Sequence, residues 1–235
     1  MDVAGWVELL RQMGADKGPG LEPGSGQEAE FEMLPSSHLS LLRLINGVTV
    51  YHGMYRLFGI GRSEPYLDMG SWNAKGTWRF AWDDRLEPYW IFGETAWGDQ
   101  YAYRRSEDGG WDRRVYFLEA NFMRADVLVD SFEDFMENDF LRNARESYDS
   151  FGREVVKRHG AISPADHWVL SPSVAIGGPE DLDNIMKMRS IAAMIIAGDL
   201  AVPIDNSRDD EYVAAVIPWV DDAGRARLKV SFETE

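Results

Sequence analysis

The order of sequence patterns along the 235 residues constrains the fold most, because a helical segment is followed by a strand-rich segment and then by further helical segments. Between residues 48 and 117, short β-branched and aromatic runs alternate with turn residues, as in VTVYHGMYRLFGI, TWRFAW, YWIFGE, DQYAYRR and RRVYFLEA. This pattern is typical of an antiparallel sheet with hairpins, and SEDGGW (106–111) is its clearest turn. The segregation predicts an α+β fold, with a central, mostly antiparallel sheet flanked by N-terminal and C-terminal helices.

Two helices are expected before the strands. Residues 2–13 have the apolar spacing of a short amphipathic helix, and the Gly-, Pro- and Glu-rich residues 14–30 are expected to form a surface loop. In LPSSHLSLLRLINGV (34–48), apolar residues recur at helical spacing. Ser36 or Ser37 is expected to cap this helix and Asn46-Gly47 to end it.

Helical signals return after the strands. Ser131 is expected to cap a helix over residues 131–147, and a further helix is expected from about Asp149 to His159-Gly160. Pro179 or Asp181 is expected to open a last long helix. The tail then predicts a terminal hairpin, with strands at residues 212–220 and 227–232.

The charge of the chain limits its partners. Asp and Glu number 40 against 24 Lys and Arg, which gives a formal net charge of -16. Nucleic acids and anionic membranes are disfavoured, because binding them requires clustered basic residues. A basic protein partner is favoured through steered encounter. The same charge also fits a purely solubilising role.

The absence of cysteine excludes disulfides, Cys-based zinc sites and a thiol nucleophile. The first residues, MDVAGWVELLRQMG, lack the apolar core of a secretory signal, and no apolar run approaches the roughly 20 residues that span a bilayer. We therefore expect a cytoplasmic protein that does not enter a membrane.

Motifs for catalysis are missing from the sequence. The four His residues lack metal-ligand spacing, and neither a GxSxG elbow nor a phosphate-binding GxxxxGK[ST] loop is present. We therefore expect no catalytic residues, no metal ligands and no cofactor. Paired acids such as Asp83 and Asp84 fit a carboxylate-based hydrolase, but also a solvated loop in a chain this acidic.

The segment YWIFGETAWGDQYAYR (89–104) combines aromatic residues, glycines and acids in a strand–turn–strand unit. A sheet explains the aromatic residues but does not require Glu94 and Asp99 beside Trp97. Because Trp and Tyr anchor protein interfaces, these three residues, with Asp83 and Asp84, are candidate partner-binding residues. A tight turn around a packed Trp is an equal alternative.

Four segments together resemble a known family. The motif LPSSHLSLLRLINGV, the segment FGETAWGDQYAYR (92–104) and the helix SFEDFMEN (131–138) resemble landmarks of the SUKH superfamily. The longer segment 151–201 resembles the C-terminal region of type VI secretion immunity proteins that carry a GAD-like domain. The residues that match these patterns are Leu34, Pro35, Asn46, Gly47, Gly98, Gly160, Ile162, Trp168, Pro172, Gly177 and Gly178.

The resemblance implies an α+β fold without catalytic residues and a cytosolic immunity protein that occludes the active site of a secreted toxin. A nuclease is one such toxin, since its basic substrate cleft suits an acidic inhibitor. The resemblance also suggests three parts: residues 1–30 as an N-terminal helix and loop, 31–147 as a SUKH-like or GAD-like domain, and 148–235 as an immunity-type subdomain on the same core. A non-catalytic scaffold of the SUKH type is the main alternative, and a metal-dependent hydrolase is a further one.

Overall fold

The computed structural model describes residues 1–21, 31 and 33–234. A seven-stranded sheet forms its centre, with the strands in chain order and every neighbouring pair antiparallel. This arrangement confirms the predicted α+β fold with a central antiparallel sheet. The strands are β1 (Asp16–Lys17), β2 (Val48–Val50), β3 (Tyr55–Leu57), β4 (Tyr89–Thr95), β5 (Gln100–Arg104), β6 (Val115–Leu118) and β7 (Ala125–Val129).

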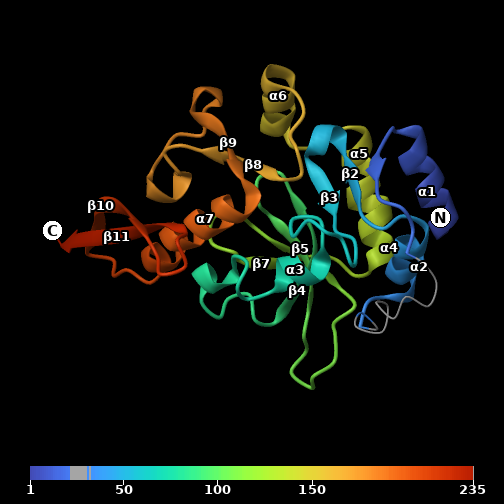
Figure 1. The fold of residues 1–235 in the computed structure, drawn as a ribbon, viewed down its shortest axis with the longest axis horizontal. Helices are drawn as coiled ribbons and strands as arrows, with labels where there is room; N and C mark the ends of the chain where they lie inside the picture. The colour runs from blue at the N-terminus through green and yellow to red at the C-terminus, as the bar shows by residue number, and fades with distance from the viewer. Residues whose placement is uncertain (22–30, 32, 235) are drawn as a thin grey trace.

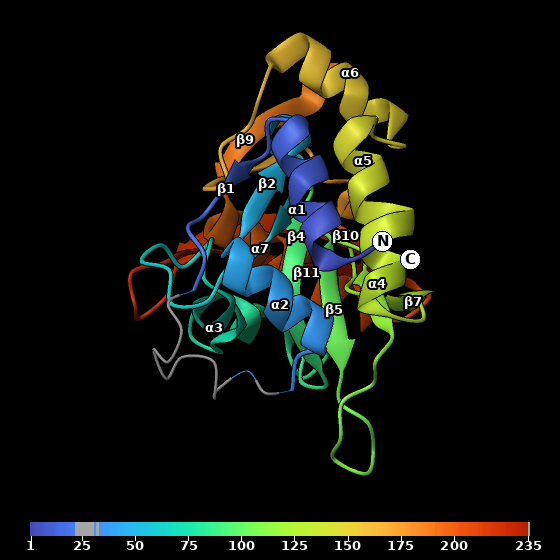
Figure 2. The same cartoon turned by 90° about the vertical axis from the view of Figure 1, so that its right-hand side faces the viewer.

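Helices that precede the strand-rich segment in the chain and helices that follow it together cover one face of the sheet (Figure 2). They are α1 (Val3–Gln12), α2 (Ser36–Leu44), α4 (Phe132–Phe135), the π-helical turn η4 (Met136–Phe140) and α5 (Leu141–Arg145). Phe92 of β4 lies at the centre of this layer, with its ring centroid 5.9 Å from Phe132 and 5.5 Å from Phe135. His38 of α2 stacks on Phe132 at 4.2 Å, and burial lowers its pKa to about 3, so the imidazole is a neutral core residue.

The C-terminal part of the chain contributes α7 (Ser190–Asp205). This helix lies on the other side of the sheet from α1 and α2 (Figure 2). Trp82, in the segment between β3 and β4, holds this segment against α7, because the Trp82 indole nitrogen donates to the carbonyl of Met194 at 2.9 Å. The remaining elements are α3 (Met69–Asn73), η2 (Tyr51–Gly53), η3 (Arg79–Trp82), α6 (Ser150–His159), the hairpin β8 (Asp166–Leu170) with β9 (Ile185–Arg189), η5 (Val174–Ile176) and η6 (Leu182–Asn184).

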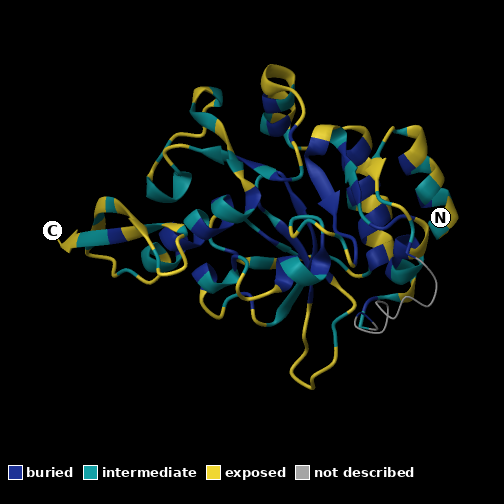
Figure 3. Cartoon of the chain, in the orientation of Figure 1, coloured by how far each residue is buried: buried dark blue, intermediate teal, exposed yellow. Residues whose placement is uncertain are grey.

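A long hairpin of β10 (Glu211–Val220) and β11 (Ala226–Thr234) extends from the body at the C-terminal end (Figure 1). It confirms the predicted terminal hairpin. Much of it is solvent-exposed, as the colouring in Figure 3 shows. Several of its large apolar residues are among the exposed ones. These are Tyr212, Ile217, Trp219 and Val220.

Several predicted helices are confirmed. The first spans Val3–Gln12, and Ser131 accepts a hydrogen bond from the backbone nitrogen of Asp134, as expected of a cap. The helix after residue 148 ends at His159, with Gly160 as its C-cap. Residues 22–30 of the predicted surface loop lie outside the described residues, and residues 16–17 of it pair with β2.

The predicted caps of α2 are wrong. The N-cap position is Pro35, with Ser36 and Ser37 inside the helix, and the C-cap is Ile45 in an extended conformation. Asn46 has a different role, because its side chain accepts from the backbone nitrogen of Ile60 at 2.7 Å and donates to the carbonyl of Ile60 at 2.8 Å. The amide therefore joins the end of α2 to the segment after β3.

Two other predicted elements are also wrong. Residues 79–82 of TWRFAW form the helical turn η3, in which Trp82 is buried against α7. The last long helix begins at Ser190, and not at Pro179 or Asp181, because residues 185–189 pair with β8 as a strand. Such short apolar runs fit both periodicities, and pairing across the hairpin decided the outcome.

Candidate functional site

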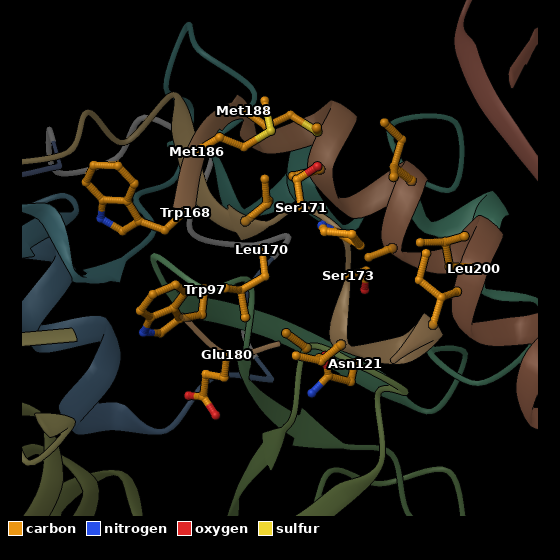
Figure 4. A pocket seen from close by; sticks show the side chains of 18 of the residues that line it. Trp97, Asn121, Trp168, Leu170, Ser171, Ser173, Glu180, Met186, Met188 and Leu200 are labelled. Carbon is orange, nitrogen blue, oxygen red and sulfur yellow. The ribbon is translucent and has the colours of Figure 1, made fainter. Parts of the chain in front are cut away.

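A cavity of about 550 Å³ opens beside the central sheet, where the C-terminal elements meet the turn between β4 and β5 (Figure 4). Trp97 and Trp168 form part of its wall, with Met186 and Met188 of β9 near Trp168 and Leu200 of α7 farther along. The volume lies within the range of about 300–1,000 Å³ that is usual for ligand-binding pockets, and the mixture of apolar walls and a few polar groups is also usual for them.

The turn between β4 and β5 positions two of the residues that line this cavity. Trp97 stacks on Phe151 of α6 with 5.6 Å between ring centroids, and its indole nitrogen donates to Asp149 Oδ2 at 2.7 Å. Asp149 also caps α6 by accepting from the backbone nitrogen of Gly152 at 2.9 Å. One carboxylate thus fixes both the start of α6 and the orientation of Trp97.

Asp99 is the second carboxylate of the cavity. Its two oxygens accept from the Thr95 hydroxyl at 2.7 Å and from the backbone nitrogen of Ala120 at 2.9 Å. Burial raises the pKa of Asp99 above its ordinary value, and the carboxylates of Glu119 and Asp149 add to the rise, while the two hydrogen bonds oppose it. A positive charge in the cavity would stabilise the ionised form of Asp99.

A buried polar cluster lies behind the turn. Glu94 of β4 accepts from Arg56 Nη1 at 2.7 Å and lies 3.1 Å from His167 Nε2, and all three side chains are buried. Burial disfavours the charged form of Glu94, but His167 and Arg56 outweigh that effect and hold its pKa below the ordinary value. Arg56 also donates to the carbonyls of Pro164 and Asp166, each at 2.8 Å. The cluster therefore joins β8 to the sheet.

The structure separates the five candidate partner-binding residues. Trp97 and Asp99 line the cavity together. The expectation that Glu94 lies on the partner-binding surface is wrong, because its side chain is 0% exposed and neutralises Arg56. Asp83 and Asp84 are exposed after η3 and do not line the cavity.

Several of the residues on which the sequence resemblance rests shape the loops around the cavity. Trp168 and Pro172 line it. Gly98 has φ +92°, and a Cβ there would lie 3.1 Å from Met194 Sδ and 3.4 Å from His167 Nδ1, so the turn needs a residue without a side chain. A Cβ on Gly178 would collide with the carbonyl oxygen of Pro172. Leu34 packs in the core, Gly47 and Gly177 have positive φ, and Gly160 caps α6.

Sequence patterns do not assign Asp149, Phe151, Met186, Met188 or Leu200 to a binding site. The sequence marks Asp149 only as the start of a helix, and in the structure it is the N-cap of α6. The capping signal is local, whereas the contact with Trp97 joins residues 52 positions apart in the chain. No spacing rule links the two positions.

Within residues 1–21, 31 and 33–234, no group of three or more His, Asp or Glu side chains is arranged to hold a metal ion. None of the helices in the same residues combines the length and the apolar character needed to cross a bilayer.

Comparison with known proteins gives a fold relationship. No family model matches the chain. No curated protein matches it either. Among solved structures, the crystal structure of Atu4351 from Agrobacterium tumefaciens is similar, with a TM-score of 0.53 and 12% sequence identity over 95% of this chain and 97% of that chain. At this identity the similarity shows a shared fold over nearly the whole length of both proteins.

Proposed function

We propose that this protein is a non-catalytic immunity protein that binds a cognate secreted antibacterial toxin and neutralises it by occluding the toxin's active site. One observation carries the proposal. The walls of the 550 Å³ cavity include the carboxylates of Asp99, Asp149 and Glu180, and no Lys, Arg or His is among the described residues that line it. A site of this kind suits a cationic group from a partner.

The overall charge supports the same partner. A net charge of -16 accelerates encounter with a basic protein, such as a nuclease with a positive substrate cleft. The exposed apolar residues of the β10–β11 hairpin, including Ile217 and Trp219, offer further contact area beside the cavity, since Val216 and Leu228 of the same hairpin line it. The resemblance to type VI secretion immunity proteins adds the biological context.

The experiment is co-expression with the product of the adjacent gene. We expect a stable one-to-one complex on size-exclusion chromatography and protection of the host cells from toxicity. The double variant Trp97→Ala with Asp99→Asn is expected to weaken the complex, because it removes an aromatic anchor and a charge from the cavity. Glu107→Gln, at the exposed tip of the β5–β6 loop, is the matched control for loss of one negative charge.

The two readouts separate binding from neutralisation. A folded protein that forms no complex with the adjacent gene product and gives no protection would overturn the proposal. Circular dichroism of each variant shows whether a loss of binding comes from loss of the fold.

A further inference from the structure

We propose that the cavity accepts an inserted segment of the partner that carries an arginine or lysine side chain beside an apolar residue. This inference rests on the proposed function, because it specifies which chemical group of a protein partner enters the site. It is carried by two features of the cavity: the aromatic and thioether walls, and two carboxylates without cationic partners.

The aromatic and thioether walls suit the stem of a long basic side chain. Trp97 lies stacked against Phe151, and Trp168 forms another part of the wall. Guanidinium groups and methylene stems pack well on aromatic surfaces. Lys187 Nζ already lies 4.9 Å from the ring centre of Trp168, which leaves the half-buried Trp97 as the aromatic surface for the stem of a guest side chain. Met186 and Met188 can adjust to an irregular guest, because thioether side chains are flexible.

Two of the cavity carboxylates, Asp99 and Asp149, have only neutral hydrogen-bond donors. Asp99 is bonded to the Thr95 hydroxyl and the Ala120 backbone nitrogen, and Asp149 to the Trp97 indole and the Gly152 backbone nitrogen. Neither forms an ion pair within the described residues, whereas Asp199, on the same helix as Leu200, is paired with Arg227. Two adjacent carboxylates without a counter-charge attract a cation more strongly than the paired acids elsewhere on the protein.

The size of the cavity favours a peptide segment over a free amine. Its volume of about 550 Å³ exceeds the need of one side chain and leaves room for an apolar neighbour.

The test uses short peptides as probes of the isolated protein. Ac-Leu-Arg-Leu-NH2 is compared with its citrulline analogue, which has nearly the same shape but no charge, and with the free amine 4-phenylbutylamine. Binding is followed by NMR of the indole N–H groups, and the Trp97 signal is assigned by its loss in Trp97→Phe. We expect the arginine peptide to shift the Trp97 and Trp168 signals and to bind about tenfold or more tightly than the citrulline peptide, since charge-assisted hydrogen bonds are lost.

Variants locate the binding. The double variant Asp99→Asn with Asp149→Asn is expected to lower affinity for the arginine peptide about tenfold or more, because both carboxylate charges are lost. Asn preserves the helix cap at residue 149, so the variant is expected to fold. Asp84→Asn removes an exposed charge outside the cavity and is expected to leave the affinity unchanged.

Three results would overturn the inference: no shift of the two indole signals, equal affinity for the arginine and citrulline peptides, or tighter binding of the free amine than of the peptide. These outcomes are independent of the toxin. If the arginine peptide binds but no toxin complex forms, the proposed function fails while the chemistry of the cavity stands. If the toxin complex forms and the Asp99/Asp149 double variant does not weaken it, the inference fails while the function stands.

Discussion

Trp97 Nε1 lies 2.7 Å from Asp149 Oδ2, and this hydrogen bond joins the turn between β4 and β5 to the first turn of α6. It makes one wall of the cavity depend on a contact between the central sheet and the C-terminal part of the chain. Trp97→Phe keeps the stacking on Phe151 but removes the donor. We expect a loss of about 1–2 kcal/mol in the free energy of unfolding, measured by urea denaturation, because Asp149 loses one of two partners. An unchanged midpoint would show that the bond contributes nothing to stability.

Glu94→Gln tests the buried cluster behind the turn. The substitution leaves the Arg56 charge buried without a counter-ion, so we expect a loss of about 3–5 kcal/mol in the free energy of unfolding. Because the pKa of Glu94 is lowered in the folded protein, its stabilising effect is present above the ordinary pKa and is lost as pH falls through the folded value. Urea titrations from pH 7 to pH 3 are therefore expected to show a shrinking difference between the two proteins. A constant difference would contradict this account.

Removing the carboxylate charge of Asp139, in the π-helical turn η4, is expected to stabilise the protein, in contrast to the loss expected at Glu94. Burial raises its pKa to about 6, against one opposing hydrogen bond from Asn143, and one of its carboxylate oxygens has no partner among the described residues. At pH 7 the charged form is therefore disfavoured in the folded state. We expect Asp139→Asn to raise the free energy of unfolding by about 1–3 kcal/mol at pH 7.

The pH dependence checks the cause of that gain. With a raised pKa, the wild-type protein recovers stability as pH falls through about 6 towards the ordinary value, so the advantage of Asp139→Asn is expected to shrink over that range. Asp126→Asn, at an exposed carboxylate of β7, is the control and is expected to change stability by less than about 0.5 kcal/mol. A gain that persists unchanged at pH 4 would exclude the burial of Asp139 as its source.

Gly98→Ala separates backbone strain from crowding in the same turn. Gly98 and Gly109 both have positive φ, at +92° and +86°, but an added Cβ meets Met194 and His167 at residue 98 and open space at residue 109. We expect Gly109→Ala to cost about 1 kcal/mol and Gly98→Ala about 1–2 kcal/mol more, from thermal or urea unfolding. Equal losses of stability in the two variants would mean that Met194 and His167 move away from the added Cβ at no cost in free energy.

The sequence predicted the fold where the signals were local. Ser131 and Asp149 cap helices as their positions indicate. The alternating segments between residues 48 and 117, apart from TWRFAW, contribute strands of the central sheet. It failed where pairing with a distant segment decided the outcome, since residues 185–189 become a strand only because β8 lies beside them.

The candidate site was predicted in part for the same reason. Trp97 and Asp99 belong to one turn, and their unusual combination was visible in the sequence. Glu94 lies in the same segment, yet a register shift between Ile91 and Gly93 changes the alternation of β4, and Glu94 reaches Arg56 and His167 inside the protein. Other residues of the site, including Asp149 and Trp168, come from a part of the chain that no local pattern connects to the turn.

The most direct test of the central claim is a binding titration between this protein and the purified product of the adjacent gene, in an inactive form, by isothermal calorimetry. We predict a one-to-one complex with submicromolar affinity, weakened by Trp97→Ala with Asp99→Asn and unchanged by Glu107→Gln. The absence of measurable binding by the folded wild-type protein, together with no protection in cells, would contradict the account.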